Sequence, residues 1–243
     1  MPAPTTKRRL WTPSLTAFGG RRSRRKFYYE AFIPPPIEGL ELPLQTDVAS
    51  VVTEAEVAVR SLNENSLRLG SLEVLGRQLL RAEAVASSRI EGLEMSHRRL
   101  ARAAADPEHA DATARAVLGN LRAMERAIEI GSAARALTVP RLLELHRELF
   151  RDTPDAQRAG RVREAQNWLG GREDSPLGAE FIPPPEDQVD RLLRDLCEFV
   201  DRDDVPAVAQ AGVAHAQFET KFARAFGPGV TRCVPLRRNK LSP

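Results

Sequence analysis

The stretch EDQVDRLLRDLCEFV at residues 186–200 places an apolar side chain at every third or fourth position. This spacing gathers the apolar residues on one face of a helix and the charged residues on the other. Such a helix is stabilised mainly by packing of its apolar face, so the chain must supply elements that cover it. With 243 residues, the chain is long enough for one good-sized domain or two small ones.

The same helical period recurs along the chain and predicts several further helices. They are expected at residues 47–62, 71–86 and 110–130, from Thr138 onward with Pro140 in the first turn, and from about residue 205. Threonine is a good helix cap, and proline fits the first turn because the amide there has no helical partner. Gly131 is expected to end the helix before it. The fold class that this pattern predicts is all-α.

Extended segments are few in this sequence. The stretch AEFIPPP at residues 179–185 favours an extended backbone, because a proline disfavours helix in the residue before it. A near copy, AFIPPP, lies at residues 31–36. Two copies do not make a repeat array. We therefore expect a helical bundle with one short β-hairpin, placed at residues 179–185.

Cysteine, histidine and apolar residue usage excludes several classes of protein. The two cysteines give no disulfide framework, and the four histidines show no metal-ligand spacing. No apolar run approaches the length of a membrane span, and the basic N-terminus lacks the apolar segment of a secretory signal. The sequence predicts a cytoplasmic protein with no bound metal and no membrane partner.

Charge is distributed unevenly along the chain. The formal net charge is +3, but residues 1–29 and 221–243 together carry +14, so the rest carries −11. Basic ends of this kind either bind nucleic acid or an anionic surface, or are solvated extensions. The acidic body does not favour nucleic acid as a partner. Residues 1–27 are interpreted as a disordered basic extension.

Several segments, taken in order, resemble the Fic family. They are YYEAFIPPP from Tyr28, EAVASSRIEG at 83–92, LLELHRELF at 142–150, AGRVREAQNWLGG at 159–171, EFIPPPEDQVDRLLRDLCEFV at 180–200, and AHAQFET at 214–220. The resemblance implies a Fic-type helical bundle with an N-terminal helical module at residues 28–130, a partial Fic core at 131–220 and a divergent basic tail at 221–243. It also implies the activity of most of the family, which is transfer of AMP from ATP, with Mg²⁺, to a hydroxyl of a target protein.

Residues 87–92 resemble the inhibitory motif of this family, Ser/Thr-x-x-x-Glu-Gly/Asn, as Ser87, Glu91 and Gly92. Residues four apart share one face of a helix, and Gly92 can end that helix. The resemblance implies that Glu91 pairs with an active-site arginine and blocks the place of an ATP phosphate. The alternative is a surface glutamate near a helix end.

The flap of the family is expected around the second proline-rich stretch. By the same resemblance, Trp168 and the segment Phe181, Ile182 and Pro183 lie in the flap that holds a target peptide by strand addition. The alternative is a proline-rich surface turn.

Four residues nearby have simpler interpretations. Arg161 and Arg163 are either surface charges or contacts within the Fic core. Cys197 lies on the apolar face of its helix and is interpreted as a small core residue. His215 is interpreted as structural rather than catalytic.

The catalytic signature of the family, Ile-His-Pro-Phe-x-Asp/Glu-Gly-Asn-Gly-Arg, is missing from the place where it should follow the last helix. In that signature the histidine takes the proton of the target hydroxyl and the acid holds Mg²⁺. Here Phe222 stands at the histidine position, and the tail contains no acid. Gly227, Gly229 and Arg232 are at most a remnant of the phosphate loop, because the proline between the glycines has no amide to donate.

The abrupt change after residue 220 leads us to expect a frameshift in the gene or its sequence record, and a premature end. The chain as given is expected to transfer no AMP and to bind ATP and Mg²⁺ unproductively. Two alternatives stay open: a catalytically inactive binding or regulatory module, and a binder of anionic surfaces or nucleic acid through the basic ends. A homodimer is also compatible with the sequence.

Overall fold

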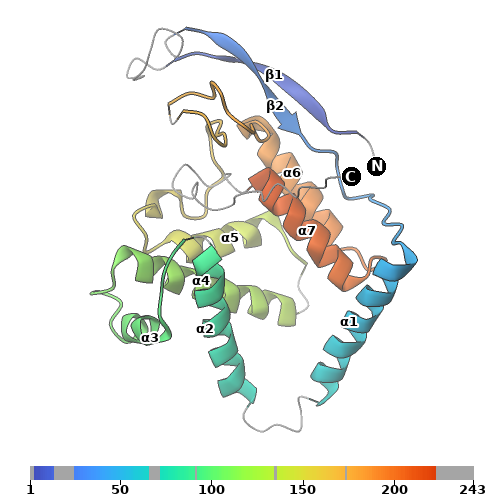
Figure 1. The fold of residues 1–243 in the computed structure, drawn as a ribbon, viewed down its shortest axis with the longest axis vertical. Helices are drawn as coiled ribbons and strands as arrows, with labels where there is room; N and C mark the ends of the chain where they lie inside the picture. Colours follow the sequence, from blue (N-terminus) through green and yellow to red (C-terminus); the bar gives the residue numbers. More distant parts are fainter. Residues whose placement is uncertain are drawn as a thin grey trace, which may run out of the picture.

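The computed structural model describes residues 3–13, 25–65, 72–90, 92–133, 136–172 and 174–222. Two strands come first, β1 (Thr5–Trp11) and β2 (Phe27–Ile33). They are followed by α1 (Thr46–Asn65), α2 (Leu72–Ile90), α3 (His97–Ala105), α4 (Ala112–Ser132), α5 (Val139–Phe150), the 3₁₀ turn η2 (Ala156–Arg158), α6 (Glu186–Val200) and α7 (Ala207–Phe222). Figure 1 shows the resulting arrangement, which is mostly helical with one two-stranded antiparallel sheet. The predicted fold class is confirmed.

The helix boundaries follow from local signals that the sequence displays. The Thr138 hydroxyl accepts a hydrogen bond from the Arg141 amide at the start of α5, as expected of a helix cap. The helix α4 continues one residue beyond Gly131 and ends at Ser132. The short helix α3 was not predicted, although Ser96 caps it by accepting a hydrogen bond from the Arg99 amide.

The regular sheet lies in a different place from the predicted hairpin. Strands β1 and β2 pair in antiparallel register, with Arg9 opposite Tyr29 and Trp11 opposite Phe27. Residues 5–11 were expected to belong to a disordered basic extension, and the structure corrects this part of the interpretation. Along residues 179–185 the chain forms one isolated bridge, between Leu169 and Phe181, instead of a regular hairpin.

Two separate clusters of buried side chains form the interior. The first joins α2, α3 and α4, and its members include Val85, Leu100 and Val117. The second surrounds α6, with contributions from α5, α7 and the segment that follows β2. Ile37 in that segment is fully buried in the second cluster. By packing, the hairpin and residues 34–42 therefore belong with α6 rather than with the helices of the N-terminal module.

A buried carboxylate fastens the segment after β2 to α6. Asp195 accepts hydrogen bonds from the backbone amides of Ile37, at 2.7 Å, and Glu38, at 3.0 Å. These two amides lie in a non-helical stretch with no strand partner to satisfy them, so the carboxylate takes that role. The path from β2 to α1 is thereby fixed on the surface of α6.

Helix α4, which belongs to the first cluster, crosses α5, which contributes to the second. A Cβ atom added at Gly119 of α4 would lie 2.2 Å from the backbone oxygen of Leu149 in α5, so only glycine allows this approach. Ion pairs flank the crossing: Arg122 lies 2.7 Å from Asp152, and Arg126 lies 2.8 Å from Glu144. Helices α4 and α5 are therefore in close backbone contact, and ion pairs fix their orientation.

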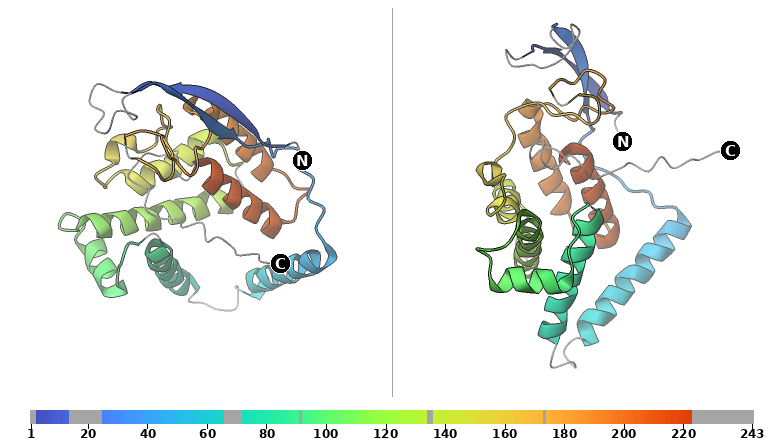
Figure 2. Two further views of the ribbon diagram at one scale, coloured as in Figure 1. Left: turned by 45° about the horizontal axis from the view of Figure 1, so that its top comes forward. Right: turned by 60° about the vertical axis from the view of Figure 1, so that its left-hand side comes forward.

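The first helix is far less covered than the others. In Figures 1 and 2, α1 lies apart from α2, α3 and α4, and its principal contact is with α7. Val48, Val51 and Val59, three of the residues predicted to form its apolar face, are 45%, 65% and 53% exposed. The predicted helix is present, but its apolar face is largely open to solvent.

Candidate functional site: the flap and the inhibitory motif

The segment predicted to be the flap, and called the flap below, is the chain reversal between α5 and α6. Leu169 donates a backbone hydrogen bond to the Phe181 oxygen at 2.8 Å, and the Glu180 amide donates to the Leu169 oxygen at 2.8 Å. Gly171 has a φ of 69°, and a Cβ atom there would lie 2.7 Å from the Ala179 nitrogen, so the turn requires glycine. The stretch predicted to be a flap or a surface turn is therefore a closed loop with paired backbone.

The β1–β2 hairpin lies on this flap. The Phe32 amide donates a hydrogen bond to the Ile182 oxygen at 2.8 Å, and the rings of Phe32 and Phe181 are 5.6 Å apart. Trp11 meets Trp168 edge to face, with ring centroids 5.3 Å apart. Figure 1 shows the hairpin crossing above the flap and the start of α6.

Two ion pairs hold the middle of strand β1 to the first turn of α6. Lys7 lies 2.5 Å from Asp187, and Arg9 lies 2.7 Å from Glu186. The helix dipole favours acidic side chains in the first turn of a helix, and the carboxylates of these side chains pair with the two basic residues of β1. The Lys7 ammonium, hydrogen-bonded to Asp187, holds the pKa of that carboxyl below its usual value.

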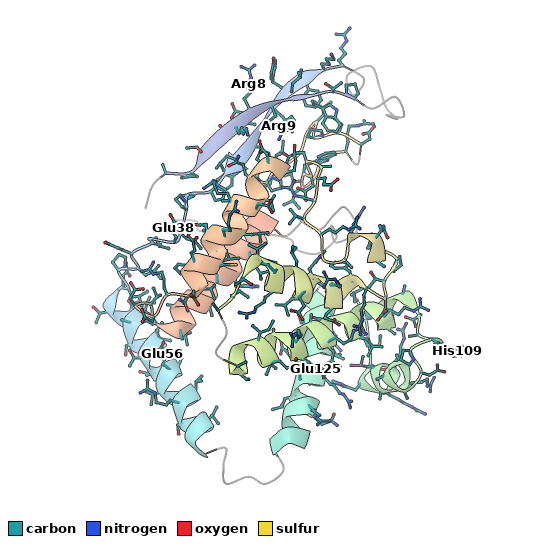
Figure 3. The ribbon with its side chains drawn as sticks, turned by 180° about the vertical axis from the view of Figure 1, so that it is seen from behind. Arg8, Arg9, Glu38, Glu56, His109 and Glu125 are labelled. Carbon is teal, nitrogen blue, oxygen red and sulfur yellow. The ribbon has the colours of Figure 1, made fainter. Side chains whose placement is uncertain are left out.

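Sequence reasoning missed these hairpin residues, because the stretch TTKRRLW does not alternate apolar and polar residues. The period of strand β1 shows only in its burial. Lys7, Arg9 and Trp11 are half-buried, while Thr6, Arg8 and Leu10 between them are exposed. This alternation is the period of a strand with one covered face. Figure 3 shows Arg9 on the side toward α6 and Arg8 on the far side, where its guanidinium lies over the Tyr28 ring.

The structure shows different surroundings for Arg161 and Arg163, whose roles the sequence left open. Arg161 is exposed. The Arg163 side chain donates hydrogen bonds to the backbone oxygens of Pro184 and Ala165, under the flap. Burial lowers the pKa of Arg163 to about 10, so the side chain keeps its charge at neutral pH. Arg163 is therefore a contact within the core that fixes the proline segment of the flap.

The residues predicted to form the inhibitory motif lie at the end of α2. Gly92 has a φ of 77°, its amide donates to the Arg89 oxygen at 3.0 Å, and the Leu93 amide donates to the Ser88 oxygen at 2.9 Å. This is the glycine-ended pattern of helix termination, so the predicted helix end is confirmed. Ser87 is half-buried. Glu91 lies outside the described residues, and its inhibitory role stays a prediction.

The remaining sites of the catalytic region lie at or beyond the end of α7. The backbone of Phe222 closes this helix, but its side chain is outside the described part. Gly227, Gly229 and Arg232 also lie outside the described residues. His215 is exposed on α7.

Cys197 is a buried residue of α6. The Cys197 side chain is 7% exposed, and burial raises the pKa of its thiol to about 11. It is a packing residue, as predicted. Within the described ranges, the structure contains no group of three or more histidine, cysteine or acidic side chains that could hold a metal ion. Among the helices that the structure describes, none has the length and apolarity to cross a membrane.

Two sequence-family comparisons agree with this arrangement. The model described as Fic/DOC family N-terminal matches residues 49–129, and the model described as Fic/DOC family matches residues 136–223. The chain therefore belongs to the Fic/DOC family and carries the N-terminal module of that family before its Fic domain. A comparison with curated proteins gave no match.

Proposed function

We propose that this chain is a Fic-family protein that binds a target protein and carries an inhibitory motif but does not itself transfer AMP. The observation that carries the proposal is the contrast between the two ends of the Fic match. Around Leu169 and Phe181 the flap is folded with paired backbone. At the far end, Phe222 stands where the catalytic histidine of the family is expected.

The donor set in the tail does not fit ATP and Mg²⁺. Residues 221–243 contain no aspartate or glutamate, which are the side chains that Mg²⁺ prefers as ligands. Val230 stands where the first phosphate-binding arginine of the family is expected, and Arg232 is the nearest basic residue after it. We therefore derive no catalytic step for this chain. Its proposed role is to bind the target protein at the flap.

The ion pairs of β1 weaken the proposal that the basic ends bind nucleic acid. Lys7 and Arg9 already contact Asp187 and Glu186 of α6. A side chain engaged with a carboxylate contributes less to phosphate binding, because the pair must first be broken. The binding-module alternative is favoured over the anionic-surface alternative for this reason.

The test compares Glu91→Gly in two backgrounds. The first is this chain; the second carries a His-Pro-Phe-x-Asp-Gly-Asn-Gly-Arg segment in place of the residues from Lys221 onward. Each protein is incubated with labelled ATP and Mg²⁺. We expect label on the protein only in the second background, because release of an inhibitory glutamate requires an active site to release. Label transfer by the present chain above a no-enzyme control would overturn the proposal.

A further inference from the structure

One pentapeptide, Phe-Ile-Pro-Pro-Pro, occurs twice in this chain, and its two copies touch. The copies are residues 32–36 and 181–185, separated by 149 positions. The backbone hydrogen bond between them, from Phe32 to Ile182, is 2.8 Å long, and the two phenylalanine rings lie against each other. Of the six prolines, all but Pro36 are buried. The chain thus binds a copy of its own flap sequence.

The contact uses the free edge of β2. One edge of this strand pairs with β1, in which Thr6 is opposite Phe32. The Phe32 amide instead points to the flap and adds β2 to the flap backbone at Ile182. Strand addition of this kind is a general mode of peptide recognition, in which backbone bonds give affinity and side-chain pockets give sequence preference. Here the segment that is added to the flap backbone belongs to the chain itself.

The hairpin is fastened by contacts that can be broken one at a time. Its principal element contact is the pairing of β1 with β2, and a two-stranded hairpin alone is marginally stable in water. The ion pairs to α6 are partly exposed: the Lys7 and Asp187 side chains are 41% and 49% exposed, and those of Arg9 and Glu186 are 30% and 24% exposed. Such pairs are weakened by salt.

We propose that residues 31–36 occupy the flap edge at Phe181 and Ile182 as an internal competitor, and that the extended target segment which the family resemblance places at this edge is of the type aromatic–aliphatic–proline. A target segment must then displace the hairpin before it can bind. Because the competitor is tethered, it acts at an effective concentration in the millimolar range. The proposal names the partner class of the flap, and in that sense it rests on the proposed function.

The chain provides its own probe for displacement. It contains two tryptophans, Trp11 and Trp168, and both lie in the hairpin–flap contact. Emission excited selectively from tryptophan therefore reports this contact alone. The ligand is a dye-labelled synthetic peptide with the sequence of residues 27–36, FYYEAFIPPP, which has no tryptophan.

The experiment compares two charge reversals in neighbouring residues of the full-length chain. Arg9→Glu places a negative charge against Glu186 and releases the hairpin, whereas Arg8→Glu makes the same charge change on the exposed face of β1. We expect the peptide to bind Arg9→Glu at least tenfold more tightly than Arg8→Glu, with tryptophan emission shifted to the red in Arg9→Glu before peptide is added. A peptide with alanine in place of the phenylalanine that matches Phe32 should bind neither variant.

Three outcomes overturn the proposal: equal peptide affinity in the two variants, unchanged tryptophan emission in Arg9→Glu, or a red shift in Arg9→Glu without peptide binding. If Arg9→Glu loses helical circular dichroism, Phe32→Ala releases the same contact without a charge change, and the same criteria apply to it. The measurement contains no ATP. Failure of peptide binding therefore leaves the proposed loss of AMP transfer intact, and AMP transfer by the chain would leave the docking site intact.

Discussion

Helices α6 and α1 have the same kind of sequence and very different surroundings. Both are amphipathic, with 15 residues in α6 and 20 in α1. On α6 the apolar face is buried, and Leu192 and Phe199 have no exposed surface. On α1, Val51 is 65% exposed and Val59 is 53% exposed. The periodicity of a helix thus identifies its apolar face but does not reveal whether another element covers it.

The difference arises from what the rest of the chain brings to each helix. The face of α6 receives side chains from α5, α7 and the segment around Ile37, which Asp195 ties to α6 through two backbone amides. For α1 the principal contact is α7. Burial of apolar surface supplies most of the free energy of folding, so the two helices should contribute unequally to stability.

The largest expected effect comes from the centre of α6. Phe199→Ala removes a fully buried ring and leaves a cavity between α6 and its neighbours, at a cost of about 3–5 kcal/mol in the free energy of unfolding. Arg194→Ala, an exposed position on the same helix, is the matched control and should change little. Urea unfolding followed by circular dichroism measures both. A loss for Phe199→Ala near that of the control would show that α6 is not the core.

The helices were predictable because their signals are local. Apolar spacing identified α1, α2, α4, α5, α6 and α7, and the capping of α5 by Thr138 followed from residue type alone. The end of α2 at Gly92 could be read from the sequence for the same reason. In the candidate site, Arg163 could not be assigned from sequence, since its role depends on the backbone oxygens that the flap places around it.

The elements that sequence reasoning missed depend on distant partners. Strand β1 faces α6 with Lys7 and Arg9, side chains that resemble a solvated extension until their carboxylate partners near residue 186 are known. The contact between the two Phe-Ile-Pro-Pro-Pro copies was equally hidden, because sequence identity alone does not predict that two segments pair. The helix α3 was missed for a different reason: it is short and rich in arginine.

Helix α5 provides an intermediate case, in which the most buried residue of the predicted stripe is polar. His146 is 4% exposed, and its Nδ1 atom accepts a hydrogen bond from the Gly160 amide at 2.9 Å. Burial lowers the pKa of His146 from 6.5 to about 4, so the fold favours the neutral ring. The stability that this ring contributes is complete above pH 6.5 and is lost as the pH falls toward 4. The expected loss is about 3 kcal/mol.

The measurement is urea unfolding at several pH values between 7.5 and 4.5, for the parent chain and for His146→Phe. The variant cannot titrate at this position, so the parent chain should lose stability relative to the variant as the pH falls. The other three histidines, at positions 97, 109 and 215, are exposed and cancel in the difference. Parallel curves for the two proteins across this range would contradict the prediction.

The smallest expected effect lies on α1, and it tests the comparison most directly. Val51→Ser and Val189→Ser make the same chemical change on α1 and α6, where the parent side chains are 65% and 0% exposed. We expect Val51→Ser to change the free energy of unfolding by less than about 0.5 kcal/mol, since its methyl groups stay largely in water in the folded chain. Val189→Ser should cost on the order of 2 kcal/mol, from lost burial and a hydroxyl placed in an apolar core.

Unfolding of both variants should be followed at two protein concentrations a hundredfold apart. If Val51→Ser costs as much as Val189→Ser only at the higher concentration, a second copy of the chain covers the α1 face, because the stabilisation by a bound partner grows with the logarithm of its concentration. If the cost is large at both concentrations, the face is covered within one chain, and the contrast between α1 and α6 is wrong. A small cost at both concentrations means that the apolar face predicted for α1 stays largely exposed in the folded chain.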